Sequence, residues 1–254
     1  MVQLVGILNI TPDSFSDGDL YLDPERAVKH AEQLFADGAS LVDIGAESTR
    51  PGATPISYEV EWLRLKDVIK WFSTLYPGKL SLDTYHPETA KLALSIRDFI
   101  INDVTGNGNP AMVDVIVERQ ARCVIGHLPG PANTDIQAIH SGKQIDNIQQ
   151  VIDELLSKAG KLEDKGLKRK NIILDPGIGY GKTHELNWQL LKFARHVPGY
   201  RVMIGYSRKR FLGDKRMELK PNLAAGRIAI EAGAMYLRVH DVAGHRQLLK
   251  DLKQ

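Results

Sequence analysis

Eight short apolar runs recur along the chain, and they constrain its fold more than any other feature of the sequence. They are rich in Val, Ile and Leu and show no clean alternation of apolar and polar residues, which is typical of parallel strands buried on both faces. The runs are Leu4–Ile10, Leu41–Ile44, Leu80–Leu82, Phe99–Ile101, Cys123–Ile125, Ile172–Leu174, Val202–Ile204 and Met235–Val239.

The segments between these runs have the spacing of amphipathic helices. Ala27, Ala31 and Leu34 recur on one helical face. Asn109 and Pro110 form a start signal, because Asn caps a helix and Pro fits its first turn. Eight strand–helix alternations in 254 residues predict an α/β fold, a single (β/α)8 TIM barrel of parallel strands spanning residues 1–254 as one domain. A doubly wound open sheet is the alternative.

Charge and composition exclude several classes of protein. Thirty-three Lys and Arg against 31 Asp and Glu leave a formal charge of +2, which gives no indication of nucleic-acid binding. No apolar run approaches the roughly 18 residues of a membrane-spanning helix. The single cysteine, Cys123, cannot form an internal disulfide, and the first residues do not resemble a secretory signal. We therefore expect a cytoplasmic protein without a membrane partner.

Polar residues stand at or just beyond the ends of seven of the eight apolar runs. In a barrel the carboxyl ends of all strands face one mouth, so these side chains are predicted to gather in a single concave site. Any one of them could instead cap a helix or begin a turn. The residues are Asn9, Asp83, Asn102 with Asp103, His127, Asp175, Ser207, and Arg238 with His240.

Three glycine-rich loops invite interpretation as nucleotide-binding motifs. The loop DPGIGYGKT (175–183) fails the phosphate-loop pattern because Pro176 stands where the first glycine is required. The loop around Gly106 and Gly108 lacks the acidic residue of a dinucleotide site about 20 positions on. The third, GAESTRPG (45–52), carries two hydroxyl side chains and one Arg. We interpret it as a loop that contacts an anion.

A closed set of metal ligands cannot be identified in the sequence, but a hard cation fits. Asn9 supplies one neutral oxygen, which suits Mg²⁺ if a substrate phosphate and waters complete its shell. Arg238 and His240, two apart on one strand, are predicted to point the same way and to form an anion pocket with Asn9. The alternative is that Arg238 pairs with a carboxylate at the rim.

The basic segment GYSRKRF (205–211) directly follows the seventh predicted strand. Such a charge run is most often a solvated loop. At this position, however, Lys209 could donate to a ring carbonyl or ring nitrogen, and Ser207 could lie near the mouth. His127 is left outside the site, because a strand-end histidine is commonly bonded to the backbone.

Seven blocks, in order over essentially the full length of the chain, resemble the bacterial dihydropteroate synthases. They are GILNITPDSFSDG (6–18), LVDIGAESTRPGA (41–53), LDT (82–84), INDVTG (101–106), LDPGIGYGKT (174–183), GYSRKRFLG (205–213) and LRVHDV (237–242).

The resemblance implies a transferase of folate biosynthesis. Its reaction joins 6-hydroxymethyl-7,8-dihydropterin diphosphate to p-aminobenzoate, giving 7,8-dihydropteroate and diphosphate, with help from Mg²⁺. It also implies a homodimer and a target for sulfonamides, which mimic p-aminobenzoate. If the pterin–diphosphate bond breaks first, in an SN1-like manner, positioning and charge stabilisation matter more than a strong base.

Roles for individual residues follow from the matching blocks. The pterin would be bound by Asp83, Asn102, Asp175 and Lys209. The diphosphate and its metal would be bound by Asn9, Arg238 and His240, and the p-aminobenzoate side would be lined by Thr49, Arg50 and Ser207. Phe15 and Asp17 would lie in a first loop that closes over the reacting groups, so the resemblance implies that they act in catalysis with Lys209, Arg238 and His240.

Two departures from the family pattern lie in loops near the predicted mouth. Gly18 is followed by Asp19, and the fifth predicted strand runs into Gly126-His127-Leu128-Pro129. Three rivals remain: a pterin-dependent methyltransferase, a non-catalytic pterin-binding relative and a generic phosphosugar barrel. Ser207, Lys209, Arg238 and His240 argue against the first, because a methyltransferase has no diphosphate to bind. Intact Asn9, Arg50 and Lys209 disfavour the second, and a phosphosugar barrel would not require the set of Asp83, Asn102 and Asp175.

Overall fold

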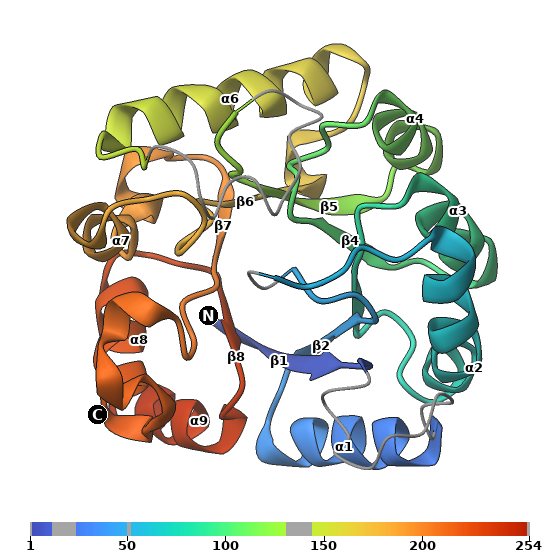
Figure 1. Ribbon diagram of the computed structural model, residues 1–254, viewed down its shortest axis with the longest axis horizontal. Helices are drawn as coiled ribbons and strands as arrows, with labels where there is room; N and C mark the ends of the chain where they lie inside the picture. The colour runs from blue at the N-terminus through green and yellow to red at the C-terminus, as the bar shows by residue number, and fades with distance from the viewer. Residues whose placement is uncertain (1, 12–23, 50–51, 131–143, 253–254) are drawn as a thin grey trace.

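Eight parallel strands close a barrel in which neighbours follow chain order and β8 returns to pair with β1 (Figure 1). The computed structural model describes residues 2–11, 24–49, 52–130 and 144–252. The predicted barrel is confirmed, and the open sheet is wrong. The strands are β1 Gln3–Asn9, β2 Leu41–Gly45, β3 Leu80–Asp83, β4 Ile100–Asp103, β5 Arg122–Gly126, β6 Ile172–Asp175, β7 Arg201–Ile204 and β8 Tyr236–Val239.

Helices form an outer ring around the strands, as Figure 1 shows. Outward-facing strand residues pack against the apolar faces of these helices in one continuous core. The start signal at Asn109 is confirmed, because its side chain accepts a hydrogen bond of 3.0 Å from the backbone N–H of Ala111. The helices are α1 Pro24–Asp37, α2 Tyr58–Leu75, α3 Pro87–Ile96, α4 Pro110–Arg119, α6 Ile148–Asp164, α7 His184–Leu190, α8 Leu219–Glu231 and α9 Val242–Asp251. Short 3₁₀ turns are η2 Arg169–Asn171, η3 Phe193–His196, η4 Arg210–Leu212 and η5 Asp214–Met217.

Inward-facing side chains fill the barrel in layers. A second, smaller core cluster consists of Val5, Leu41, Ile100, Val124, Ile173, Met203 and Tyr236. Side chains two positions apart on a strand point to the same face. The next inward positions toward the carboxyl ends are therefore polar on four strands: Asp43, Asn102, Asp175 and Arg238. An apolar floor thus lies beneath a polar mouth.

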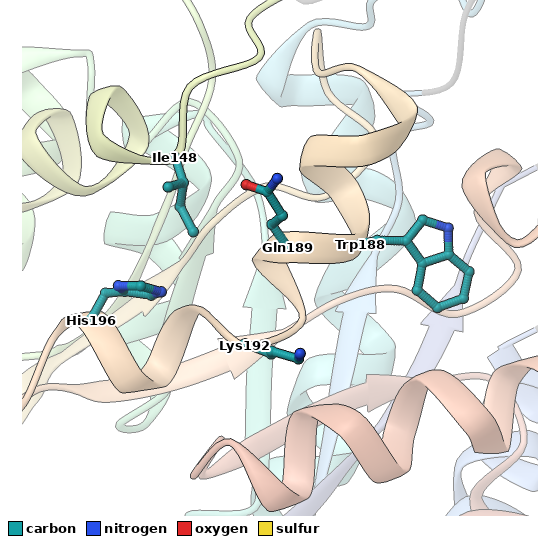
Figure 2. Close-up of a pocket in the computed structure, with 5 residues that line it drawn as sticks. All are labelled: Ile148, Trp188, Gln189, Lys192 and His196. Carbon is teal, nitrogen blue, oxygen red and sulfur yellow. The ribbon is translucent and has the colours of Figure 1, made fainter.

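A separate hollow of about 340 Å³ lies outside the ring of strands, between α6 and α7 (Figure 2). It is lined by Ile148, Trp188, Gln189, Lys192 and His196, none of which was predicted to belong to the site. Among the described residues, no helix has both the length and the apolar character needed to cross a membrane.

Candidate active site

A row of residues in register runs around part of the barrel mouth. Asn9 of β1 pairs with Gly45 of β2, Gly45 with Asp83 of β3, and Asp83 with Asn102 of β4. Asp175 ends β6 at the same mouth, opposite Gly126 of β5. Gly45 leaves room for its neighbour, because a Cβ there would lie 3.1 Å from the Cβ of Asp83.

Arg238 of β8 reaches across the barrel interior to two carboxylates. Its Nε donates to Oδ2 of Asp43 and a terminal nitrogen donates to Oδ2 of Asp83, each at 2.6 Å. The amide of Asn102 donates to the same Asp43 oxygen at 2.9 Å. These four residues are called the interior network below. The structure thus shows the carboxylate pairing that was the alternative for Arg238, although two bonds leave other guanidinium N–H groups as donors.

Asp43 is the site residue that our sequence reasoning missed. Its side chain is fully buried in the middle of β2, and its Oδ2 accepts from both Arg238 and Asn102. The predicted site residues stand at strand ends or in loops, whereas Asp43 stands inside an apolar run. An acidic residue within such a run is itself a signal, since a buried carboxylate is costly unless it is paired.

Lys209, in the loop after β7, lies near Asp175, the last residue of β6. The Lys209 ammonium donates to the carbonyl of Ile178 and lies over the ring of Tyr180, 4.8 Å from its centre. Asp175 accepts from the backbone N–H of Gly177 at 2.7 Å. Gly205, the residue after β7, lies beside Asp175, and a Cβ there would make an ordinary van der Waals contact of 3.4 Å with its carboxylate.

His240 lies one residue beyond β8, which ends at Val239, so the prediction that it shares a strand with Arg238 is wrong by one position. The short strand reflects its partner β7, which pairs with β8 only through Met203 and Ile204. His240 instead contacts Ser207, whose hydroxyl lies 3.0 Å from its Nδ1. The anion pocket of Asn9, Arg238 and His240 stays a prediction.

Thr49 lies in the segment between β2 and α2. Its hydroxyl lies 2.9 Å from that of Tyr180, in the loop after β6. Figure 1 shows this segment reaching over the middle of the ring. Phe15, Asp17, Arg50 and Asp19 lie outside the described residues, so their predicted roles stay predictions.

Burial shifts the pKa values of the ionisable side chains at the mouth. It raises the pKa of Asp83 to about 7, although the Arg238 guanidinium opposes the shift. It also raises the pKa of Asp175, which Lys209 partly offsets, and lowers the pKa of Lys209 to about 8 against the effect of Asp175. Burial alone would lower the pKa of Arg238, but the Asp43 and Asp83 carboxylates raise it.

Two other strand-end residues have structural partners. Asp103 accepts from the backbone N–H groups of Thr105 and Asn107 at 2.8 and 3.0 Å, and so holds the turn after β4. His127 is buried, and its Nε2 lies 3.0 Å from a Glu154 carboxylate oxygen. Burial lowers the pKa of His127 to about 2, so its imidazole is neutral.

The donor set at the end of β1 fits Mg²⁺ only together with a substrate. Asn9 offers one neutral amide oxygen. Within the described part of the chain, no group of three or more His, Cys, Asp or Glu side chains could hold a metal on its own. Mg²⁺ is commonly held by one or two protein ligands, waters and substrate phosphates.

Comparison with known proteins finds one family along nearly the whole chain. Residues 5–240 match the family described as pterin binding enzyme. The dihydropteroate synthase of Streptococcus pyogenes serotype M6 is 36% identical, over 99% of this chain and 94% of the relative. The Xanthomonas albilineans enzyme solved with 4-aminobenzoic acid has a TM-score of 0.85 and 34% identity; solved with 7,8-dihydropteroate it has 0.84 and 31%. Each comparison covers 99% of this chain and 92% of that structure.

The interior network generates a prediction for stability. Asp43→Asn removes the buried charge that faces Arg238, so the free energy of unfolding is expected to fall by roughly 3 kcal/mol. The measurement is chemical denaturation followed by circular dichroism. Asp114→Asn is the matched control, because the Asp114–Lys165 ion pair is exposed, and its loss is expected to change stability by less than about 0.5 kcal/mol. Equal stabilities of the two variants would contradict the role given to Asp43.

Proposed function

The chain belongs to the dihydropteroate synthase family of pterin-binding enzymes, and from this premise we propose how its barrel mouth performs the reaction. The enzyme is a transferase that forms a C–N bond and releases diphosphate. Its small-molecule substrates are 6-hydroxymethyl-7,8-dihydropterin diphosphate and p-aminobenzoate. The observation that carries the assignment of residues is the placement of Asp83, Asn102 and Asp175 at the carboxyl ends of three strands of one closed barrel.

The pterin ring is bound by Asp83, Asn102 and Asp175 together with Lys209. A pterin presents an edge of N–H donors and ring acceptors, so a carboxylate such as Asp175 can accept two parallel hydrogen bonds from it. Asn102 is oriented by Asp43 through the 2.9 Å bond between them. Lys209, which is held beside Asp175 and over Tyr180, donates to the carbonyl or nitrogen side of the ring.

The diphosphate leaves toward Asn9, Arg238 and His240. The bond between the pterin methylene carbon and the diphosphate oxygen breaks, and the oxygen keeps the electron pair. The N–H groups of Arg238 that the two aspartates leave free, and the His240 imidazole held by Ser207, stabilise the negative charge that develops. Arg238 is prepositioned for this task because its ion pairs with Asp43 and Asp83 fix its side chain.

The amine of p-aminobenzoate then attacks the methylene carbon and loses a proton to diphosphate or water. An aromatic amine needs no activating base when the carbon carries positive charge, which agrees with an SN1-like order of steps. By the family resemblance, Thr49, Arg50 and Ser207 would line the side from which p-aminobenzoate enters, and Phe15 and Asp17 would act in a loop that closes over the reacting groups. Sulfonamides would compete with p-aminobenzoate for this side of the site.

Mg²⁺ would be held by Asn9 and the substrate diphosphate, and its chemistry is to neutralise charge on the leaving group. The near-neutral formal charge and the single, buried cysteine support a cytoplasmic location. A homodimer is proposed from the family resemblance alone.

Asp175→Asn tests pterin recognition. The amide places a donor where the ring needs an acceptor, so kcat/KM for pterin diphosphate is expected to fall roughly a thousandfold. The measurement is formation of 7,8-dihydropteroate from the two substrates. Asp164→Asn, an exposed change at the end of α6, serves as control and should retain wild-type rates. Turnover of Asp175→Asn within tenfold of the wild type would contradict the proposal.

Removal of divalent cations tests the metal. Treatment with EDTA is expected to abolish most of the condensation in the same assay, and added Mg²⁺ to restore it, because the diphosphate would otherwise leave with its charge unneutralised. Rates that are the same with EDTA and with Mg²⁺ would exclude a magnesium requirement.

The lowered pKa of Lys209 predicts a pH effect. Burial brings this pKa to about 8, so the donor ammonium is present below pH 8 and is lost above it. We expect kcat/KM for pterin diphosphate, which reports the free enzyme, to decline above about pH 8. Lys209→Arg keeps its charge and should lack this decline, whatever its absolute rate. The same decline in both enzymes would assign it to another group.

A further inference from the structure

Residues 46–49, at the start of the segment between β2 and α2, reach across the barrel mouth. β2 and β6 stand four places apart in the closed ring of eight, and so lie opposite each other. The hydroxyl of Thr49 nevertheless lies 2.9 Å from that of Tyr180, in the loop that follows β6. A segment that bridges the mouth in this way must be fixed where it leaves β2, or its far end has no defined position.

Glu47 lies near the start of this segment, two residues after β2, and contacts Ile56 near its end. The Oε1 atom accepts from the Tyr85 hydroxyl and, at 3.3 Å, from the backbone N–H of Ile56. The Oε2 atom lies 3.0 Å from Nε2 of His86. The Glu47 carboxylate therefore joins the start of its own segment to Ile56 near its end, and joins the segment to the loop after β3. These contacts of Glu47 with Ile56, Tyr85 and His86 are called the Glu47 clamp below.

The carboxylate is nearly buried, so these bonds are needed to compensate its lost hydration. The side chain of Glu47 is 7% exposed and that of His86 is 18% exposed. Burial alone would lower the pKa of His86, but the bond to Glu47 and the charges of Glu61 and Glu88 raise it. The imidazole is thus favoured in its charged form, and charge-assisted hydrogen bonds are the strong ones.

Further hydrogen bonds stabilise the region around the Glu47 clamp. A terminal nitrogen of Arg64, on α2, donates to the carbonyl of Ala46 at 2.8 Å. The hydroxyl of Thr84 donates to the buried carboxylate of Glu61 at 2.8 Å and accepts from the His86 backbone N–H at 3.1 Å. The segment is therefore joined to α2 through Arg64 and to the loop after β3 through the clamp.

We propose that Glu47 is a positioning residue for the condensation: through Tyr85 and His86 it fixes the β2–α2 segment so that Thr49 lies across the mouth, on the side where p-aminobenzoate binds. The inference rests on the proposed function, since it uses the substrate side assigned there to Thr49. Glu47 touches neither substrate, and the pterin is bound by strand ends that the clamp does not contact.

The proposal predicts a selective kinetic effect. In Glu47→Ala, the KM for p-aminobenzoate is expected to rise roughly tenfold or more, because a misplaced loop loses oriented contacts. The KM for pterin diphosphate is expected to stay within about twofold of the wild type. Tyr85→Phe removes one donor to Glu47 without changing any charge, and should show the same selectivity to a smaller degree. It keeps the test informative if Glu47→Ala fails to fold.

Glu88→Gln is the matched control. Glu88 is an exposed carboxylate at the start of α3. It makes the smallest of the contributions that raise the pKa of His86, and it makes none of the hydrogen bonds of the clamp. Both Michaelis constants should remain at wild-type values. Equal rises in both constants in the clamp variants, or no rise in either, would overturn the positioning role.

Amide hydrogen exchange separates failure of the clamp from failure of the proposed function. Peptides covering residues 52–57 should exchange faster in Glu47→Ala and Tyr85→Phe than in the wild type and Glu88→Gln. Unchanged exchange would refute the clamp whatever the enzyme catalyses. A wild-type protein that forms no dihydropteroate would refute the proposed function, and the positioning role with it, while exchange would still report on the clamp itself.

Discussion

The polar residues inside this barrel are organised by one charged cluster, in which Arg238 of β8 is held between Asp43 of β2 and Asp83 of β3. A guanidinium at this depth is tolerated only because both carboxylates bind it. The same contact fixes Asp83, which is proposed to bind the pterin, and through Asp43 it orients Asn102. Residues of four strands, β2, β3, β4 and β8, thereby form one electrostatic unit at the proposed substrate site.

The rest of the site is arranged around that unit by the geometry of the fold. Inward positions change from apolar to polar within the last three residues of β2, β4, β6 and β8. The pterin would therefore lie on an apolar floor with polar groups at its edge. Strand ends and loops have separate roles at the mouth. In the proposed arrangement, residues at strand ends would face the pterin and its leaving group. The β2–α2 segment, which Glu47 anchors and which reaches Tyr180, would form the side where p-aminobenzoate binds.

The fold could be predicted from sequence because parallel buried strands are apolar almost throughout, and all eight runs are strands. Strand-end residues such as Asp83 and Asp175 could be predicted for the same reason. Asp43 was missed because it breaks the apolar rule within a strand. The Glu47 contacts with Tyr85 and His86 could not be foreseen, since they join positions about 40 residues apart through tertiary packing alone. The sequence shows that Glu47, Tyr85 and His86 are polar residues, but it does not show that they contact one another.

The most direct test of the account is a crystal structure of the protein with 7,8-dihydropteroate bound. The account predicts that the pterin ring contacts Asp83, Asn102 and Asp175 at the mouth, and that the benzoate end lies beside Thr49 and Ser207. A product molecule seated elsewhere, for example in the hollow between α6 and α7, would contradict it. So would a pterin at the mouth that makes no hydrogen bond with Asp175.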